Sequence, residues 1–493
     1  MDSQDALPQD RVKLVASTGD ITARRPRILS PEASSDEDTF SGSRHDILSY
    51  FETAQWTADG TALLTSSSTN MISGYVVPED LLSAGKSLTL KRQARIQLPE
   101  PTNVLSGAPY FSLADPWTQQ FLVSARDHPL QLFYLAPSST STGSQPPVSS
   151  YPFTKARSET FLHATSLLWP SPGTHFIAGA RSILASFDVQ RTGEEPLVRI
   201  RTIPSERHLS KGGGVGMRGT VSALSGQPMD VGSGASLVAA GTWTRWVGLY
   251  DFAQAGQCVA TWSIAAAVQD TASNVGGGNE MKNLESIGGD GITQTIWSPC
   301  GRYLMICERK SRGALIYDVR VTGKLLGYLI GRDALGNQRV ACDVFPSADG
   351  FEVWSGTANG TVKVWEGVGS QEGPHVPAWE WAAHQSTVGS TCLHPSGTVV
   401  ATCAGSWEFP DEDPAPVQSL SLAGIDLRSE ASSEDDSDES DSDRDSDSNS
   451  VTDGSGNQEP WMQRRNKESS LKLWSIASLG ATDEELPDRN DLG

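Results

Sequence analysis

The sequence predicts an all-β fold made of repeated antiparallel sheets, and a recurring pattern is the main reason. An apolar strand is followed by a turn with proline or aspartate and glycine, a second apolar strand, a short polar loop and a third strand with an aromatic residue. Clear copies start at residues 54, 296 and 393 and read AQWTADGTALLTSSSTNMISGYVV, IWSPCGRYLMICERKSRGALIYDVR and LHPSGTVVATCAGSWEF. One such sheet cannot bury both of its faces alone, so neighbouring copies must stack and complete a core.

Third strands of this kind occur seven times, which predicts a ring of seven sheets. Their aromatic residues are Tyr75, Phe133 with Tyr134, Phe187, Tyr250, Tyr317, Trp365 and Trp474. Units with this ending resemble the WD40 class of β-propeller, and VKVWE and LKLWS match the WD-repeat ending most closely. The spacings exceed the usual repeat of about 40–45 residues, so several loops are expected to be expanded. The predicted fold class is an all-β, seven-bladed WD40 β-propeller.

The seventh blade lacks a convincing fourth strand at the C-terminal side. After LKLWS the sequence continues only as a polar, acidic tail. We expect RVKLVAST, residues 11–18, to supply the missing strand and to join the two ends of the chain. Such a closure removes an exposed sheet edge.

Composition divides the chain into packed and unpacked parts. We expect residues 1–45 to be mostly disordered apart from the closing strand, and residues 46–410 to hold blades 1–6 and the start of blade 7. Residues 136–150 read as a Ser/Pro/Thr loop. An acidic, disordered insertion at residues 411–467 interrupts the last blade between its second and third strands, before a closing strand at 468–478 and an acidic tail at 479–493.

The insertion allows two readings, which the sequence leaves open. Its serine–acid spacing, as in SSEDDSDESDSDRDSDSNS, suits acidophilic kinases. A solvated spacer that is never modified would have the same composition.

Charge restricts how this chain could bind a nucleic acid. The formal net charge is −21, and residues 430–447 contribute −9 of it. Hydrophobic residues make up 37% of the chain, below the usual share, which agrees with an unpacked portion. An acidic protein does not collect RNA or DNA through its bulk charge, so any such site must be a local basic patch.

Catalytic and metal-binding motifs are missing from the sequence. There is no GxSxG elbow, no full GxxxxGKS/T phosphate loop and no HExxH helix, so we expect no enzyme, no catalytic residue, no cofactor and no metal site. His384 and His394 are expected to be structural. Six cysteines without a CxxC pair are expected to be buried, reduced thiols. Without a signal peptide or an apolar run of transmembrane length, this favours an intracellular compartment.

Loop positions predict a basic surface on one side of the ring. In such propellers, the loops between second and third strands open on the same rim as the loops that enter each first strand. Arginines gather in these loops across blades 2–6, and Trp243 and Trp246 flank Arg245. Guanidinium groups suit phosphates, and tryptophan faces suit unstacked bases. The predicted RNA-binding residues are Arg126, Arg181, Trp243, Arg245, Arg309, Lys310, Arg312, Arg332, Asn337, Gln338 and Arg339.

Two alternatives to an RNA-binding rim remain open. The arginines could pair with Asp127, Glu308 and Asp333 in neighbouring loops. The rim could also grip an acidic peptide of a protein partner.

Three segments carry a resemblance to a known family. They are AQWTADGTALLTSSSTN, GNQRVACDVFPSADGFEVWSGTANGTVKVWE and LHPSGTVVATCAGSWEFPDED, and the second places NQR directly before a blade strand. Together with the interrupted last blade, they resemble the telomerase Cajal body protein family of WD-repeat proteins. The resemblance implies a non-catalytic, nuclear scaffold that binds small nuclear or guide-type RNA and RNP proteins, with no membrane and no small-molecule substrate.

The resemblance leaves two processes open. One is the biogenesis or localisation of RNPs in nuclear bodies, of the telomerase RNA type. The other, suggested by fungal members, is a protein scaffold for small nuclear RNPs in pre-mRNA splicing, without direct RNA contact. The motif marks Asn337, Gln338 and Arg339 either as RNA contacts or as residues that hydrogen-bond neighbouring blade loops.

Overall fold

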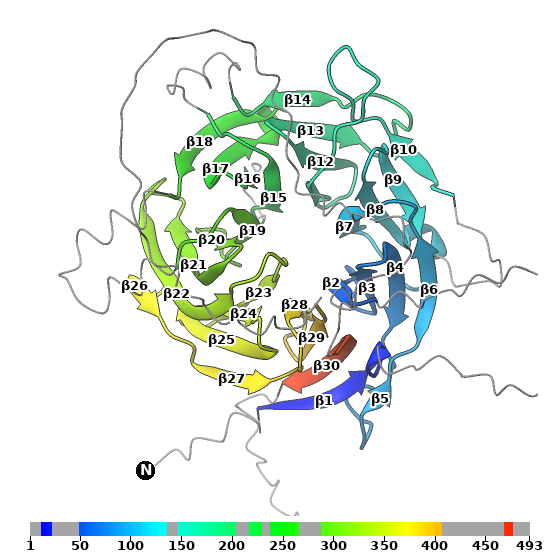
Figure 1. Ribbon diagram of the computed structural model, residues 1–493, viewed down its shortest axis with the longest axis vertical. Helices are drawn as coiled ribbons and strands as arrows, with labels where there is room; N and C mark the ends of the chain where they lie inside the picture. The colour runs from blue at the N-terminus through cyan, green and yellow to red at the C-terminus, as the bar shows by residue number, and fades with distance from the viewer. Residues whose placement is uncertain are drawn as a thin grey trace, which may run out of the picture. The chain divides into compact units, whose positions relative to one another are not determined.

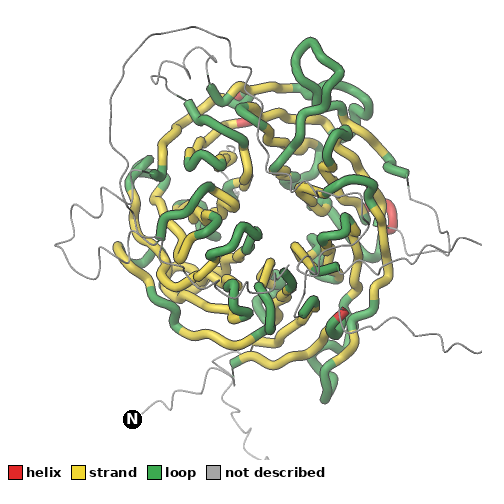
Figure 2. Tube along the Cα trace, viewed as in Figure 1, coloured by secondary structure: helices red, strands yellow, loops and turns green. Residues whose placement is uncertain are grey.

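A computed structural model describes residues 11–21, 49–135, 146–203, 216–228, 237–265, 287–406 and 468–476. All of them belong to one compact unit, Met1–Ser406 with Asn466–Gly493. Seven sheets stand around a common axis (Figure 1), and the helical content of the described residues consists of short 3-10 turns such as η3 (Pro116–Thr118) and η4 (Phe252–Gln254), as Figure 2 shows. The predicted seven-bladed β-propeller is therefore confirmed. Among these residues there is no helix with the length and hydrophobicity needed to span a bilayer.

Each blade is an antiparallel sheet whose strands follow one another from the axis outwards. Blade 1 holds β2 (Phe51–Trp56), β3 (Ala62–Ser67), β4 (Met71–Val76) and β6 (Arg92–Gln97), and blade 2 holds β7 (Thr102–Gly107), β8 (Gln120–Ala125), β9 (Leu130–Tyr134) and β10 (Ser149–Tyr151). Blade 3 holds β11 (Ser166–Leu168), β12 (His175–Ala180), β13 (Ile183–Asp188) and β14 (Val198–Arg201), and blade 4 holds β15 (Val221–Gly226), β16 (Leu237–Thr242), β17 (Trp246–Asp251) and β18 (Gln257–Ser263).

Two of the remaining three blades carry a short additional strand at the outer edge. Blade 5 holds β19 (Ile292–Trp297), β20 (Tyr303–Glu308), β21 (Ser311–Asp318), β22 (Leu325–Ala334) and the parallel β26 (Gly373–His375). Blade 6 holds β23 (Cys342–Ser347), β24 (Gly350–Gly356), β25 (Thr361–Val368) and β27 (Trp379–Ala382). Blade 7 holds β28 (Val388–Leu393), β29 (Val399–Ala404), β30 (Ser470–Ile476), β1 (Val12–Ser17) and the parallel β5 (Leu88–Thr89).

Blade 7 joins the two ends of the propeller. Strand β1 pairs antiparallel with β30, with Val12 opposite Ile476 and Ser17 opposite Lys472, and the two strands lie side by side in Figure 1. The segment in which a closing strand was expected, residues 11–18, therefore contains the fourth strand of this blade. Both neighbours of β30 in the sheet are distant in sequence, because residues 405–469 separate it from β29.

The recurrent aromatic residues lie on the third strands and pack between blades. Phe187 on β13 stacks on Phe176 with ring centroids 5.0 Å apart, and Tyr151 meets Phe176 edge-on at 5.0 Å. Tyr151 follows the segment predicted to be a loop over residues 136–150, and that prediction is wrong at its end, because Ser149–Tyr151 pairs with β9 as the fourth strand of blade 2. The predicted disordered parts at residues 22–45, 136–145, 411–467 and 479–493 lie outside the described residues.

Side chains from the innermost strands link one blade to the next. Ser166 Oγ donates to the carbonyl of Val221 (2.7 Å), which joins blade 3 to blade 4. Gln294 clamps the backbone of Cys342, donating to its carbonyl (2.9 Å) and accepting from its amide (3.0 Å), which joins blade 5 to blade 6. Ser390 Oγ donates to the carbonyl of Ala54 (2.9 Å), so blade 7 closes on blade 1.

Strand order sorts the loops onto two rims. Because successive strands of a blade are antiparallel, the loops between second and third strands share one rim with the loops that lead from one blade into the next. We call this side the entry rim. The loops between first and second strands and between third and fourth strands form the opposite rim.

Candidate nucleic-acid interface

The predicted basic residues sit at or beside the entry rim, but in different settings. Six of them lie in loops between second and third strands: Arg126, Arg181, Trp243, Arg245, Arg309 and Lys310. Arg312 is the second residue of β21, Arg332 is within β22, and Asn337, Gln338 and Arg339 lie between β22 and β23. Their burial and partners decide which of them can meet a ligand.

In blades 1 to 6, the loops between second and third strands are tight turns with a shared backbone feature. In five blades one turn residue has a left-handed backbone, with φ between +52° and +64°: Asn70, Asp127, Ser182, Arg245 and Lys310. Blade 6 has Gly360 at φ +91°, where an added Cβ would lie 2.1 Å from the carbonyl oxygen of His384. Side chains other than glycine are strained in this conformation, so the turns hold Arg245 and Lys310 at some energetic cost.

The boundary of blades 4 and 5 gathers an aromatic ring and accessible cations. Trp243 is 39% exposed, and the guanidinium of Arg309 lies over its ring at 5.9 Å. Lys310 Nζ pairs with Asp290 at 3.1 Å, and both side chains are about half exposed. Arg312 is exposed. An exposed ion pair contributes only about 0–1 kcal/mol, so these cations can exchange a carboxylate for a phosphate at little cost.

Arg245 is committed to a buried partner. Its Nε donates to Glu308 Oε1 at 2.6 Å and its Nη2 to Oε2 at 3.1 Å, and the Glu308 side chain is only 2% exposed. A buried carboxylate needs this compensation. Trp246, expected to flank the arginine at the surface, instead packs against the buried cluster around Met217 and Tyr250. The sequence-based alternative of pairing with Glu308 therefore holds for Arg245.

Arg332 is a correction to the predicted set. It is 1% exposed, and its guanidinium donates to the carbonyls of Glu308 and Val340 and to the hydroxyl oxygens of Ser311 and Ser355. Four acceptors in the core satisfy it, so it joins blade 5 to blade 6 and cannot touch a ligand on the rim. The sequence placed it in a loop because Gly331 and Asp333 flank it, whereas β22 continues to Ala334.

Two members of the NQR triplet hold loops together. Gln338 Nε2 donates to the carbonyl of Gly405 in blade 7 at 2.8 Å. Arg339 reaches from blade 6 to blade 3, where its Nη2 donates to the carbonyl of Thr165 at 3.3 Å. Burial lowers the pKa of Arg339, and the charge of Glu52 on β2 opposes that shift. Asn337 is exposed. Of the two readings of the triplet, loop bracing fits Gln338 and Arg339, and only Asn337 is presented to a ligand.

The accessible set is smaller than the predicted one. Arg126 is half exposed with a loose contact to Asp127 at 3.8 Å, and Arg181 is exposed next to a backbone bridge with Thr220. Asp333 pairs with Lys363 at 3.5 Å rather than with an arginine. The surface that we call the basic rim consists of Arg126, Arg181, Trp243, Arg309, Lys310 and Arg312.

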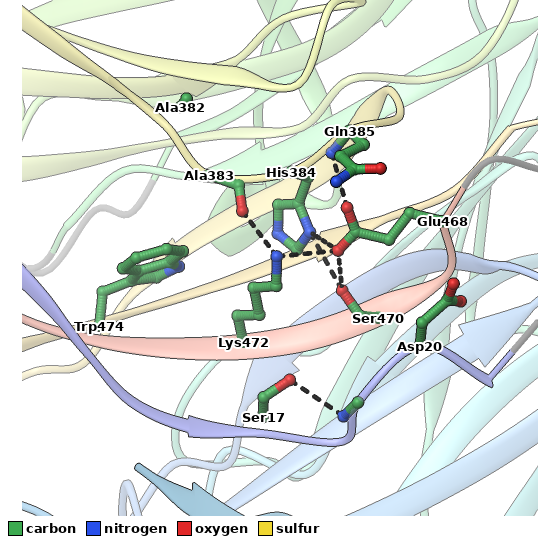
Figure 3. Close-up of a pocket in the computed structure, with 11 residues that line it drawn as sticks. Ser17, Asp20, Ala382, Ala383, His384, Gln385, Glu468, Ser470, Lys472 and Trp474 are labelled. Atoms are coloured by element: carbon green, nitrogen blue, oxygen red, sulfur yellow. Dashed lines mark hydrogen bonds and ion pairs between the residues drawn. The ribbon is translucent and has the colours of Figure 1, made fainter. Parts of the chain in front are cut away.

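A polar chain inside blade 7 anchors the return from the long insertion (Figure 3). Trp474 Nε1 donates to Thr402 Oγ1 at 2.9 Å, the same hydroxyl pairs with His384 Nε2 at 2.8 Å, and His384 Nδ1 pairs with Glu468 Oε1 at 3.0 Å. Glu468 Oε1 also pairs with Lys472 Nζ at 2.8 Å. His384, Glu468, Lys472 and Trp474 line a pocket of about 540 Å³. The groups of this polar chain satisfy one another, so His384 has the structural role that was expected.

The cysteines are free thiols, but not all of them are buried. Cys307, Cys342 and Cys403 are buried, Cys392 is partly buried, and Cys258 and Cys300 are exposed. The expectation of buried thiols is wrong for the last two. Cys258 occupies an outermost strand and Cys300 a turn, where the sequence pattern of a strand does not report burial.

Comparisons with known proteins agree with the resemblance found in the sequence. No family model matches the chain. The protein of Bos taurus named Telomerase Cajal body protein 1 is 24% identical over 375 residues, covering 73% of this chain and 59% of the relative. The Homo sapiens protein of that name is 23% identical over 368 residues, covering 73% and 58%. The chain is therefore similar over most of its length to proteins named Telomerase Cajal body protein 1.

The comparisons also limit what can be transferred. This chain spans about 59% of the length of the Bos taurus relative. A Schizosaccharomyces pombe protein named Guanine nucleotide-binding protein negative regulator 1 is 24% identical over 333 residues, covering 67% of this chain and 73% of that protein. Sequence identities near 24% are compatible with a shared propeller and different ligands.

Proposed function

We propose that this chain is a non-catalytic, nuclear WD40 scaffold that binds small nuclear or guide-type RNA on the basic rim and acts in the biogenesis or localisation of RNPs. The observation that carries the proposal is the cluster of Trp243, Arg309, Lys310 and Arg312 in a protein of net charge −21. Accessible arginines beside an exposed indole suit a single strand, whose phosphates pair with the cations and whose bases stack. The names of the relatives support a role in nuclear bodies.

The experiment is a salt titration of RNA binding with matched triple variants. Replacing Arg309, Lys310 and Arg312 by alanine removes three positive charges from the entry rim. Loss of three phosphate contacts should weaken binding of the cellular small-RNA fraction and lower the slope of log K against log salt by about 2.

Blade 5 supplies the control on its opposite rim. Arg302, Arg320 and Lys324 are exposed there, and replacing them by alanine changes the net charge equally. If both triple variants bind RNA like the wild type, or lose binding equally, the basic rim is not the RNA site.

The second candidate is a protein scaffold in splicing whose basic rim holds an acidic peptide of a small nuclear RNP protein. The partly exposed pairs with Asp127 and Asp290 favour it, because they already show these cations holding carboxylates. Complete nuclease digestion before purification of complexes separates the two candidates. Partners that all survive digestion, with no RNA retained, support the protein scaffold.

A further inference from the structure

One tryptophan on the opposite rim is presented to solvent. Trp117 lies in η3, within the loop between β7 and β8 of blade 2, and it is 74% exposed. Tryptophan gains more from burial than any smaller residue, so such exposure marks a contact surface. Leu113 and Val148 are also exposed, at 37% and 45%, on the same rim of this blade.

The loop holds this ring in place. The Asp115 carboxylate accepts a hydrogen bond from the Trp117 amide at 3.1 Å, and Thr118 Oγ1 accepts from the Ser112 amide at 2.9 Å. The indole and the Tyr134 ring meet in an edge-to-face arrangement, with ring centroids 6.0 Å apart and an interplanar angle of 76°. A side chain that is already ordered loses little entropy on binding, so the exposed face is prepared for a partner.

Two other tryptophans of this chain show which group packs on an indole face. The guanidinium of Arg11 lies over Trp379 at 5.5 Å, and Glu366 accepts hydrogen bonds from Arg11 Nη1 (3.4 Å) and Trp379 Nε1 (2.8 Å). The guanidinium of Arg309 lies over Trp243. In both cases a guanidinium lies on an indole, and at Trp379 a carboxylate holds both groups. In the described part of the chain, no cation lies over Trp117.

The charged residues in the loops around Trp117 also favour a cationic ligand. The loops at residues 57–61 and 108–119 contain Asp59 and Asp115 but no lysine, arginine or histidine. The amide of Leu113 donates to Asp59 Oδ2 at 2.7 Å, which joins the two loops. Burial alone would raise the pKa of Asp59, but hydrogen bonds from neighbouring hydroxyl and amide groups outweigh it and lower the pKa. Two carboxylates at this surface repel phosphates, in contrast to the basic rim.

We propose that Trp117 is the docking platform for an arginine side chain of a protein partner. The guanidinium lies flat on the open indole face with Asp115 and Asp59 as its acidic surroundings, and Leu113 and Val148 contact the apolar residues beside it. Arginine is favoured over lysine because its planar group stacks on an aromatic face. This surface is independent of RNA binding on the entry rim.

The test compares labelled 12-residue peptides that alternate glycine with arginine, lysine or uncharged citrulline. Fluorescence anisotropy measures their binding to the full chain. The acidic stretch at residues 430–447 attracts both cationic peptides by bulk charge, so the informative quantity is the ratio of the arginine to the lysine affinity. We expect this ratio to be about 3 to 10 in the wild type, from the usual strength of a cation over an indole, with weak binding of the citrulline peptide.

Three variants make the result specific. Trp117→Ala should reduce the arginine-to-lysine ratio to about 1, in line with the loss of a cation–indole contact. Trp117→Phe should keep part of it, and Trp243→Ala should leave it unchanged. An unchanged ratio in Trp117→Ala, or a loss caused by Trp243→Ala instead, overturns the proposal. Two further results for Trp117→Ala also overturn the proposal. If this variant loses self-association, the Trp117 surface binds a second copy of the chain, and if it loses binding to a 12-nucleotide uridine RNA, the surface binds a base.

Discussion

At the scale of single residues, Lys310 combines a strained backbone with a half-exposed side chain. Lys310 has φ +52° in a turn where blade 6 has a glycine, Gly360. Among the described residues, its Nζ pairs with the exposed Asp290. Nothing in the fold requires a lysine there, so we infer that its charge serves ligand binding at the expense of stability.

Replacing Lys310 by glycine should therefore have opposite effects on stability and binding. Relief of the left-handed strain should raise the free energy of unfolding by about 0.5–1 kcal/mol, and loss of one phosphate contact should lower the salt slope of RNA binding by about 0.7. Urea denaturation and a salt titration measure the two effects. Lys310→Ala removes the charge but keeps the strain, so equal stability of the two variants would contradict this explanation.

Replacing Arg245 should, in contrast, lower the stability of the fold. Its removal leaves the buried carboxylate of Glu308 uncompensated, and Arg245→Ala should cost about 3 kcal/mol of stability. A second change, Glu308→Gln, should restore much of that loss, as expected for two groups in direct contact. If Arg245→Ala is as stable as the wild type yet fails to bind RNA, this account of Arg245 is wrong and the residue contacts the ligand.

The sequence could predict which rim the arginines of the predicted site occupy, but not which of them a ligand can reach. Loop position follows from strand order, and strand order was readable from the repeat. Burial was not readable, because Arg332 and Arg309 each stand next to an acid and Arg245 stands between a threonine and a tryptophan, and none of these neighbours indicates whether the arginine is buried. Arg332 is buried because β22 continues to Ala334, and Arg245 is paired because the Glu308 side chain is buried beside it. Both features depend on packing between blades.

At the scale of elements, blade 7 depends on the polar chain from Trp474 to Glu468. Burial lowers the pKa of His384, so the neutral ring fits the blade. Burial alone would raise the pKa of Glu468, but hydrogen bonds from His384, Lys472, Ser470 and the Gln385 amide outweigh it and lower the pKa well below its usual range. Both shifts favour the folded state at neutral pH and lose that effect as the pH falls.

Acid should therefore loosen the propeller in two steps. The contribution of His384 is complete above its unfolded pKa of about 6.5 and declines below it, by about 1.4 kcal/mol for each unit by which the folded pKa is lowered. The contribution of Glu468 declines below about pH 4.3. The melting temperature should fall between pH 7 and pH 5 in the wild type, and less steeply in His384→Gln, which cannot titrate. Parallel curves for the two proteins would show that His384 is not the responsible group.

Ring closure at this blade was predictable because the repeat lacked one strand and the N-terminus offered one. The role of Glu468 was not predictable. It stands at the end of a low-complexity stretch, 62 residues after Ser406, and only the fold brings it to His384.

At the scale of the whole molecule, the two rims differ in chemistry. The entry rim presents exposed arginines and lysine around Trp243, whereas the opposite rim of blades 1 and 2 presents Trp117 in a loop that contains Asp115 and is joined to Asp59 through the Leu113 amide. We infer that one scaffold can hold an RNA on one side and a protein on the other.

Crosslinking of RNA to the intact chain tests the central claim most directly. Cells labelled with 4-thiouridine are irradiated, and the peptides joined to RNA are identified by mass spectrometry. We predict crosslinks at Trp243 and within residues 309–312 on the entry rim. Crosslinks confined to the opposite rim, such as residues 298–302 and 319–324 of the same blade, or none above background, would contradict RNA binding by the basic rim.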